Sequence, residues 1–156
     1  MGFSGIIVVA RSARPLSELD SMRGCAGTPV WSGTDGEWQA VQLADADPPP
    51  GVLDETGAPV LVATVVNGSF ALVSAASPGG AEWTGVLGPD QAERQPLPVK
   101  FQVAPEDVVD PALDWARAAG RAPNLDRLED VLLAEPDPTA EDLVFELLAA
   151  LGFALR

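Results

Sequence analysis

The 156-residue sequence contains no histidine, no tyrosine and a single cysteine, Cys25. Without histidine, the chain has no Ser-His-Asp or Cys-His catalytic group, no histidine metal site and no histidine pH switch. One cysteine excludes an intrachain disulfide and a zinc site built from cysteines. These absences favour a protein that is not an enzyme, and we predict no catalytic residue, no metal site and no cofactor.

Basic residues are also scarce, with 9 Lys and Arg against 23 Asp and Glu and a formal net charge of −14. Only one of the basic residues is a lysine, Lys100. Because this charge repels phosphate groups, it disfavours binding to nucleic acid and to anionic membranes. Keeping the protein in solution is a sufficient explanation for the acidity. The alternative is that the charge attracts a basic protein partner.

The first residues, MGFSGIIVVARS, lack the features of a signal peptide. They have no basic first region, and their apolar run is too short to span a membrane. We therefore expect a cytoplasmic protein with no membrane partner. The preference for arginine over lysine, together with frequent alanine, glycine and proline, favours a bacterial source.

The length of the chain and its 47% hydrophobic content suit one domain with a sizeable core. We expect a single α+β domain over residues 1–156, with strands and turns in 1–104 and helices in 105–156. Because the strands come first and the helices last, the sheet should be largely antiparallel. We predict five to six strands, packed by about three C-terminal helices.

Short apolar or alternating runs predict the strands. The candidate runs for these strands lie at residues 5–10, 30–32, 37–43, 60–66, 69–75, 81–87 and 97–103. A short helical segment is expected within residues 14–22, and a polar loop at 44–51.

The hairpin around the Asn-Gly pair at 67–68 is the clearest structural signal, since this pair favours positive φ angles and a type I′ turn. A two-residue loop would pair Val66 with Ser69 and place Val62 and Val73 on one face. Both faces of the hairpin are apolar, so both should be covered. Helices are expected on one face. Loops, further strands or a second subunit are the alternatives for the other.

Three helices are predicted after residue 105. Asp110 is the expected N-cap of the first, with Pro111 in its first turn and Gly120 after its end. The second should lie within 124–136 and the third within 139–152. In each helix, apolar residues recur at the spacing that marks one buried side, and Trp115 lies on such a stripe.

The segment WSGTDGEWQAVQ, residues 31–42, places two tryptophans on either side of an acidic glycine turn. If the turn centres on residues 33–36, the two tryptophans can pair across the strands. An aromatic and acidic surface of this kind can receive arginine or lysine through stacking and cation–π contacts. The predicted partner-binding surface consists of Trp31, Asp35, Glu37, Trp38 and Trp83. The alternative is that the tryptophans belong to the core or cover the sheet edge.

The carboxylates form two clusters along the chain. The first comprises Asp35, Glu37, Asp45, Asp47, Asp54 and Glu55. The second comprises Glu106, Asp107, Asp110 and Asp114. A solvated helix face is favoured for the second cluster, because the helix dipole stabilises acids at a helix start. The first cluster is left open between a solvated face and a partner surface. A hard-cation site is the least favoured alternative, because the segment at residues 45–51 lacks the spacing of a calcium-binding loop.

We therefore expect a non-catalytic protein-interaction module whose charge speeds its encounter with a basic partner. Immunity proteins and antitoxins that cover a basic active site share this size and charge, an analogy of physical profile alone. The alternative is a small hydrolase or ligand-binding domain with carboxylates in a cleft beside the sheet. A concave pocket with convergent acids and a raised carboxylate pKa would favour it. Self-association through an apolar sheet face, giving a homodimer, is a third hypothesis.

Overall fold

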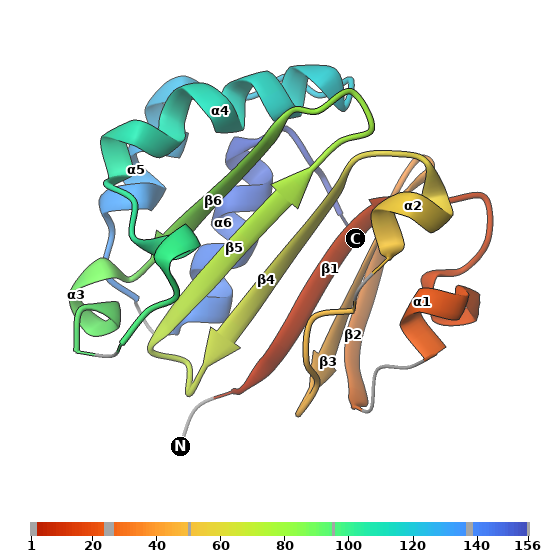
Figure 1. Ribbon diagram of the computed structural model, residues 1–156, viewed down its shortest axis with the longest axis horizontal. Coiled ribbons are helices and arrows are strands. Elements are labelled where there is room, and N and C mark those ends of the chain that lie inside the picture. Colours follow the sequence, from red (N-terminus) through yellow and green to blue (C-terminus); the bar gives the residue numbers. More distant parts are fainter. Residues whose placement is uncertain (1–2, 24–26, 50, 95, 137–138, 156) are drawn as a thin grey trace.

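The computed structural model describes residues 3–23, 27–49, 51–94, 96–136 and 139–155, so Cys25 lies outside the described residues. Six strands form one antiparallel sheet in the order β2-β3-β1-β4-β5-β6 (Figure 1). The strands are β1 (Gly5–Arg11), β2 (Thr28–Asp35), β3 (Trp38–Ala44), β4 (Val60–Val66), β5 (Phe70–Ala76) and β6 (Glu82–Leu87). The helices α4 (Pro105–Ala118), α5 (Leu125–Leu133) and α6 (Ala140–Ala150) follow the sheet in sequence. The predicted α+β class is confirmed.

Strand β1 lies at the centre of the sheet, between β3 and β4. Its first six residues are all buried, as expected for an apolar run covered on both faces. Ile7 and Val9 belong to the core beneath the C-terminal helices, whereas Ile6 and Val8 belong to a separate cluster on the other face. Because successive side chains of a strand point to opposite faces, β1 contributes residues to both hydrophobic clusters.

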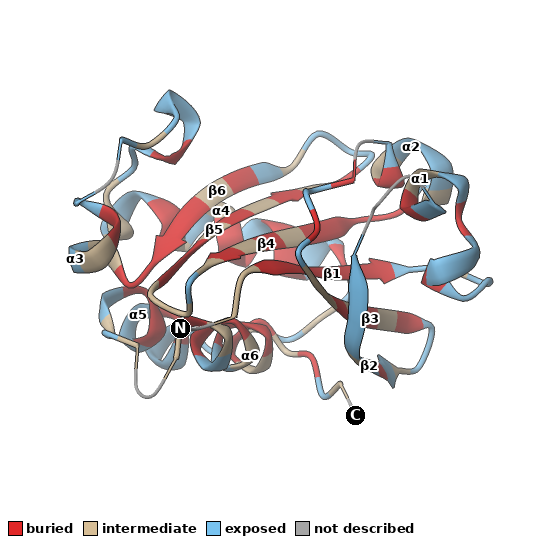
Figure 2. Ribbon diagram, turned by 90° about the horizontal axis from the view of Figure 1, so that it is seen from below, coloured by how far each residue is buried: buried red, intermediate tan, exposed pale blue. Residues whose placement is uncertain are grey.

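Helices α4, α5 and α6 cover one face of the sheet, and buried residues line the contact (Figure 2). Trp115 is fully buried there, as its place on the helical stripe predicts. Its indole N–H donates a hydrogen bond of 2.9 Å to the carbonyl of Ala76 at the end of β5. Because a buried polar group needs a partner, this bond helps to set the position of α4 on the sheet.

Short segments of the same chain cover the other face. The 3-10 helix η1 (Leu16–Glu18) and the helices α1 (Asp20–Arg23) and α2 (Val52–Thr56) cover the β1 side, and α3 (Pro89–Ala92) and the 3-10 helix η2 (Val99–Phe101) cover the β5–β6 side. Leu16 and Met22 pack in the first of these clusters, and Phe101 packs in the second. The expected covers for this face were loops, further strands or a second subunit, and the structure instead shows short helices with their connecting loops. The homodimer stays a prediction, which sedimentation at several protein concentrations would test.

The β4–β5 hairpin has the predicted turn but a different register. Both residues of the Asn-Gly pair have positive φ angles, 53° and 66°. However, Val66 pairs with Phe70 rather than with Ser69. Because side chains alternate between faces, this one-residue shift moves Val73 opposite Ala63, in the core under the helices. The prediction that Val73 shares a face with Val62 is therefore wrong.

The segment 97–103 is not a strand, although its residues alternate between apolar and polar. Pro96 and Pro98 have no backbone N–H to donate to a neighbouring strand, and the chain forms the short 3-10 helix η2 instead. Phe101 is buried, but Val99, which a strand would place on the same face, is 83% exposed. The alternation of apolar and polar residues in this segment therefore does not mark a strand, and Phe101 is its one buried large side chain.

Helix α4 begins five residues before the predicted cap at Asp110. Its N-cap is Ala104, Pro105 occupies the first turn, and Pro111 lies inside the helix. The added turn carries Val108 into the core, and this burial accounts for the longer helix.

None of the described helices combines the length and apolar character needed to cross a membrane.

Candidate functional site

Two of the predicted surface residues, Trp38 and Trp83, are buried. The ring of Trp38 lies 4.9 Å from that of Phe153 and 6.4 Å from that of Trp115, measured between ring centres. The indole N–H of Trp83 has no hydrogen-bond partner among the described residues. The sequence left two interpretations open for these tryptophans, a partner-binding surface or the core. Their burial fits the core.

Trp31 and Trp38 do not face each other across the hairpin. The residue opposite Trp31 is Gln42, and the residue opposite Trp38 is Asp35. Strand β2 continues through Asp35, so the turn forms at Gly36, which has a φ angle of 62°. The turn is therefore centred two residues later than expected. This shift accounts for the absence of the predicted tryptophan pair.

The side chains of Trp31 and Glu37, also on this hairpin, remain at least partly exposed to solvent. Trp31 is half-buried on the edge strand, and its ring packs edge to face against Phe145 of α6, with the ring centres 5.1 Å apart. Trp31 thus covers an edge of the sheet. Glu37 is exposed and lies on the rim of a cavity beside β1.

The carboxylate of Asp35 is engaged within the chain. It accepts hydrogen bonds from the guanidinium of Arg121 and from the backbone N–H of Ala154, the latter at 2.9 Å. Arg121 also donates from Nε to the carbonyl of Gly152 at 3.1 Å and lies 4.9 Å from the centre of the Phe153 ring. The two charged side chains are only 24% and 21% exposed. Asp35 therefore ties the hairpin to the C-terminal segment.

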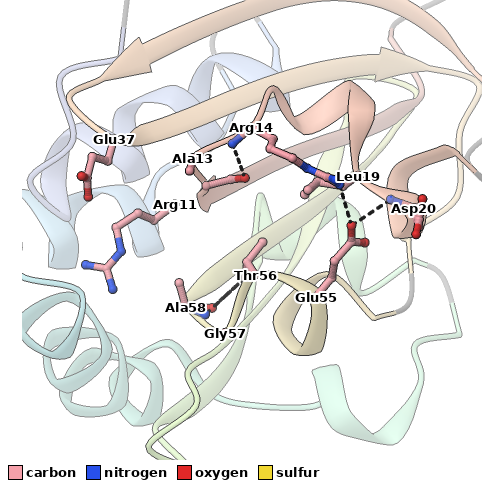
Figure 3. Close-up of a pocket in the computed structure, with 11 residues that line it drawn as sticks. Arg11, Ala13, Arg14, Leu19, Asp20, Glu37, Glu55, Thr56, Gly57 and Ala58 are labelled. Atoms are coloured by element: carbon pink, nitrogen blue, oxygen red, sulfur yellow. Dashed lines mark hydrogen bonds and ion pairs between the residues drawn. The ribbon is translucent and has the colours of Figure 1, made fainter.

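The cavity beside β1 has a volume of about 540 Å³ and lies next to α1 and α2 (Figure 3). Arg11 and Glu37 line one end, and Arg14 and Glu55 line the other. Glu55 accepts hydrogen bonds from the backbone of Ser21 at 2.7 Å and of Asp20 at 2.9 Å, and from Arg14 at 3.2 Å.

The backbone N–H of Ser21 is the main cause that lowers the pKa of Glu55, and the Arg14 guanidinium lowers it further. Glu55 is therefore held in its ionised form at the start of α1. Its role here is to satisfy the first N–H groups of a short helix. A raised pKa, the sign expected of a carboxylate-based catalytic site, is not found at Glu55.

A second hollow, of about 500 Å³, lies between α3 and the segment that follows α5. Its charged lining residues are Asp90, Arg94 and Glu135. Desolvation raises the pKa of Glu135, and the charge of Asp90 raises it further. A carboxylate with a raised pKa can serve as a general acid or base. Within the described ranges, no group of three or more Cys, Asp or Glu residues could hold a metal ion.

The outer surface of α4 and α5, called here the acidic helical face, exposes seven carboxylates and two arginines. The carboxylates are Glu106, Asp107, Asp110, Asp114, Asp126, Glu129 and Asp130. Three of them lie in the first turn of a helix, where the helix dipole accounts for them. The other four lie beyond the first turns, so the dipole does not explain their placement.

A groove of about 340 Å³ lies within the acidic helical face, between the N-terminal half of α4 and the C-terminal end of α5. Its lining comprises Pro105, Glu106, Val109, Asp110, Glu129, Leu132 and Leu133. No basic side chain lines the groove. Within the part of the chain that the structure describes, none of its three carboxylates forms an ion pair or a side-chain hydrogen bond.

The groove was not predicted from the sequence, which favoured a solvated face for the carboxylates of α4. A signal for it is present on α5, where Leu133 follows Glu129 by four residues, so that both lie on one side of the helix. Leu133 is 68% exposed and lines the groove together with Val109 and Leu132.

Comparisons with known protein families, with curated proteins and with solved structures gave no match for this chain.

Proposed function

We propose that this protein is a non-catalytic interaction module that binds a basic protein partner through the acidic helical face. The observation that carries the proposal is the density of charge there, with seven exposed carboxylates and two arginines on two adjacent helices. One of these arginines, Arg117, lies 3.8 Å from Asp114 and offsets part of the charge.

The electrostatic field of such a face accelerates the encounter with a cationic surface and orients the two proteins as they meet. Helices α4 and α5 are anchored by a fully buried residue each, Trp115 and Leu128, so the carboxylates are carried on packed elements. Immunity proteins and antitoxins, which neutralise a partner by covering its basic active site, share this profile of size and charge. A role of that kind is the form of the proposal that we favour.

The proposal is tested by affinity capture from an extract of the source organism, followed by identification of the bound proteins. The wild-type protein is compared with the double variant Asp114→Lys/Asp130→Lys, which reverses two charges of the acidic helical face. The matched control, Glu82→Lys/Glu93→Lys, makes the same change in net charge at exposed positions elsewhere.

We expect the wild type and the control to retain the same basic protein and to release it as the salt concentration rises, because salt screens exposed charges. The Asp114→Lys/Asp130→Lys variant should retain little of it. Equal retention by the two double variants, or retention that does not depend on salt, would contradict the proposal.

A second candidate function is a small carboxylate-based hydrolase or ligand-binding domain. The pair formed by Asp90 and Glu135 favours it, because the pKa of Glu135 is raised and both residues line one hollow. Hydrolysis of an ester, phosphate and glycoside panel would test it, with Glu135→Gln expected to abolish turnover and Glu129→Gln to preserve it. The interaction module is the stronger candidate, because Asp90 and Glu135 are both exposed, whereas catalytic sites usually exclude water.

A further inference from the structure

We infer that the groove between α4 and α5 receives one amphipathic basic helix of the partner, with an apolar side chain inserted between carboxylates on both rims. This inference rests on the proposed function and specifies which part of the acidic helical face makes the central contact, and with what kind of segment.

The apolar part of the groove supplies the anchor position. Leu132 is fully buried at its base, Val109 is half-buried on the α4 side, and Leu133 is 68% exposed. A contiguous apolar patch rimmed by polar residues marks many protein–protein interaction sites, and these three apolar residues line one groove together with three carboxylates. A volume of about 340 Å³ admits a few inserted side chains, whereas the backbone of the partner would stay outside.

The charges of the groove select a basic partner. Glu106 and Asp110 lie on α4 one helical turn apart, and Glu129 lies on α5 across the groove. Like charges at this spacing on one helix repel each other. An arginine or lysine placed between them would relieve that repulsion, and one near Glu129 would do the same for the opposite rim. The complement of the groove is therefore an apolar residue with basic residues on both sides.

A helix presents this complement and an extended strand does not. Successive side chains of a strand point to opposite faces, so only one row can enter a groove. A helix presents a central apolar stripe at positions i, i+3 and i+4, and its flanking residues fan out to both sides. Because carboxylates lie on both rims of the groove, the helix is the segment that satisfies both.

The inference is tested with two synthetic peptides of identical composition, rich in leucine, alanine and arginine. In the first, the leucines form one stripe of a helix, with arginines along both sides. In the second, the order is scrambled, which keeps the charge and removes the stripe. Binding to the full-length protein is measured by isothermal titration calorimetry at low and at moderate salt. We expect the striped peptide to bind more tightly than the scrambled one.

Variants of the groove locate the contact. Leu133→Ser should weaken binding of the striped peptide about tenfold, since it removes much of the apolar contact of one leucine. Leu125→Ser is the matched control, because Leu125 is a 45% exposed leucine of the same helix that does not line the groove. Glu129→Lys should weaken binding more than Asp130→Lys, the equivalent change at the next position, outside the groove.

Equal salt-dependent binding of the two peptides would overturn the groove inference and leave the proposed function standing. Equal effects of Leu133→Ser and Leu125→Ser would overturn the groove inference as well. Retention of a basic protein in the affinity capture, together with no binding of either peptide, would likewise reject the groove and leave the broader proposal intact.

Discussion

The carboxylate of Asp35 on β2 accepts a hydrogen bond from the guanidinium of Arg121, a residue 86 positions further along the chain. The same carboxylate accepts the backbone N–H of Ala154, so three distant segments meet at one side chain. Asp35 is among the residues for which the sequence suggests partner binding. Through these hydrogen bonds, its carboxylate links the β2–β3 hairpin to the segment after α4 and to the C-terminal segment.

Removing the carboxylate of Asp35 should destabilise the protein. We expect Asp35→Ala to lower the free energy of unfolding by about 2–3 kcal/mol, because a largely shielded guanidinium and a backbone N–H lose their acceptor. Glu37→Ala, at an exposed position of the same hairpin, should change it by no more than about 0.5 kcal/mol. Urea unfolding monitored by tryptophan fluorescence measures both. Equal effects would show that the ion pair contributes little to stability.

Two buried tryptophans offer a comparison of a paired and an unpaired indole. Trp115 donates to the carbonyl of Ala76, whereas the N–H of Trp83 has no partner among the described residues. Replacement by phenylalanine removes a similar volume at each position. We expect Trp115→Phe to cost at least about 1 kcal/mol more than Trp83→Phe, because it removes a hydrogen bond, whereas Trp83→Phe removes a buried N–H that has no partner among the described residues. Thermal unfolding of both variants tests this order, and the reverse order would argue against a role for the hydrogen bond.

The hydrogen bonds to Glu55 predict a stability that depends on acid pH. The Ser21 N–H is the main cause that holds the pKa of Glu55 below its ordinary value of 4.5. A lowered pKa in the folded state contributes stability above the pKa of the unfolded chain, and that contribution is lost as pH falls through the folded value. The difference in unfolding free energy between wild type and Glu55→Gln should therefore shrink as pH falls from about 6 to about 3. A constant difference across this range would contradict the assignment.

Glu135 should show a dependence of the opposite sign. Desolvation and the neighbouring Asp90 raise the pKa of Glu135, so its favourable contribution is present at acid pH and is lost as pH rises through the folded value. We expect Glu135→Gln to raise the unfolding temperature at pH 7 and to have less effect near pH 4. Asp90→Asn should act in the same direction at pH 7, because it removes the charge that Glu135 faces. A lowered unfolding temperature in both variants at pH 7 would refute this account.

Much of the fold follows from local patterns in the sequence. The β-branched run in β1, the Asn-Gly turn of the β4–β5 hairpin and the apolar stripes of α5 and α6 are signals carried by residues close together in the chain. The segment 97–103 carries the same kind of signal, and there the prediction is wrong. Its alternation is that of a strand, but Pro98 within it and Pro96 directly before it lack the N–H groups that a strand donates.

The candidate site was harder to predict from local patterns, because the register of a hairpin and the burial of its side chains depend on residues far away in the sequence. The turn between β2 and β3 forms two residues later than expected, and the two tryptophans thus lose the predicted pairing. Trp38 instead meets Phe153, near the other end of the chain. No pattern within residues 31–42 specifies that contact.

The sequence by itself determined the net charge, the absence of histidine chemistry and the order of strands before helices, since these follow from composition and local periodicity. Only the tertiary structure decided which carboxylates are engaged and which are free. Asp35 and Glu55 accept hydrogen bonds from distant segments, whereas Glu106, Asp110 and Glu129 line one groove that no basic side chain lines. The reason is physical: an ion pair or a groove joins residues that the path of the chain brings together, and spacing along the sequence does not encode that path.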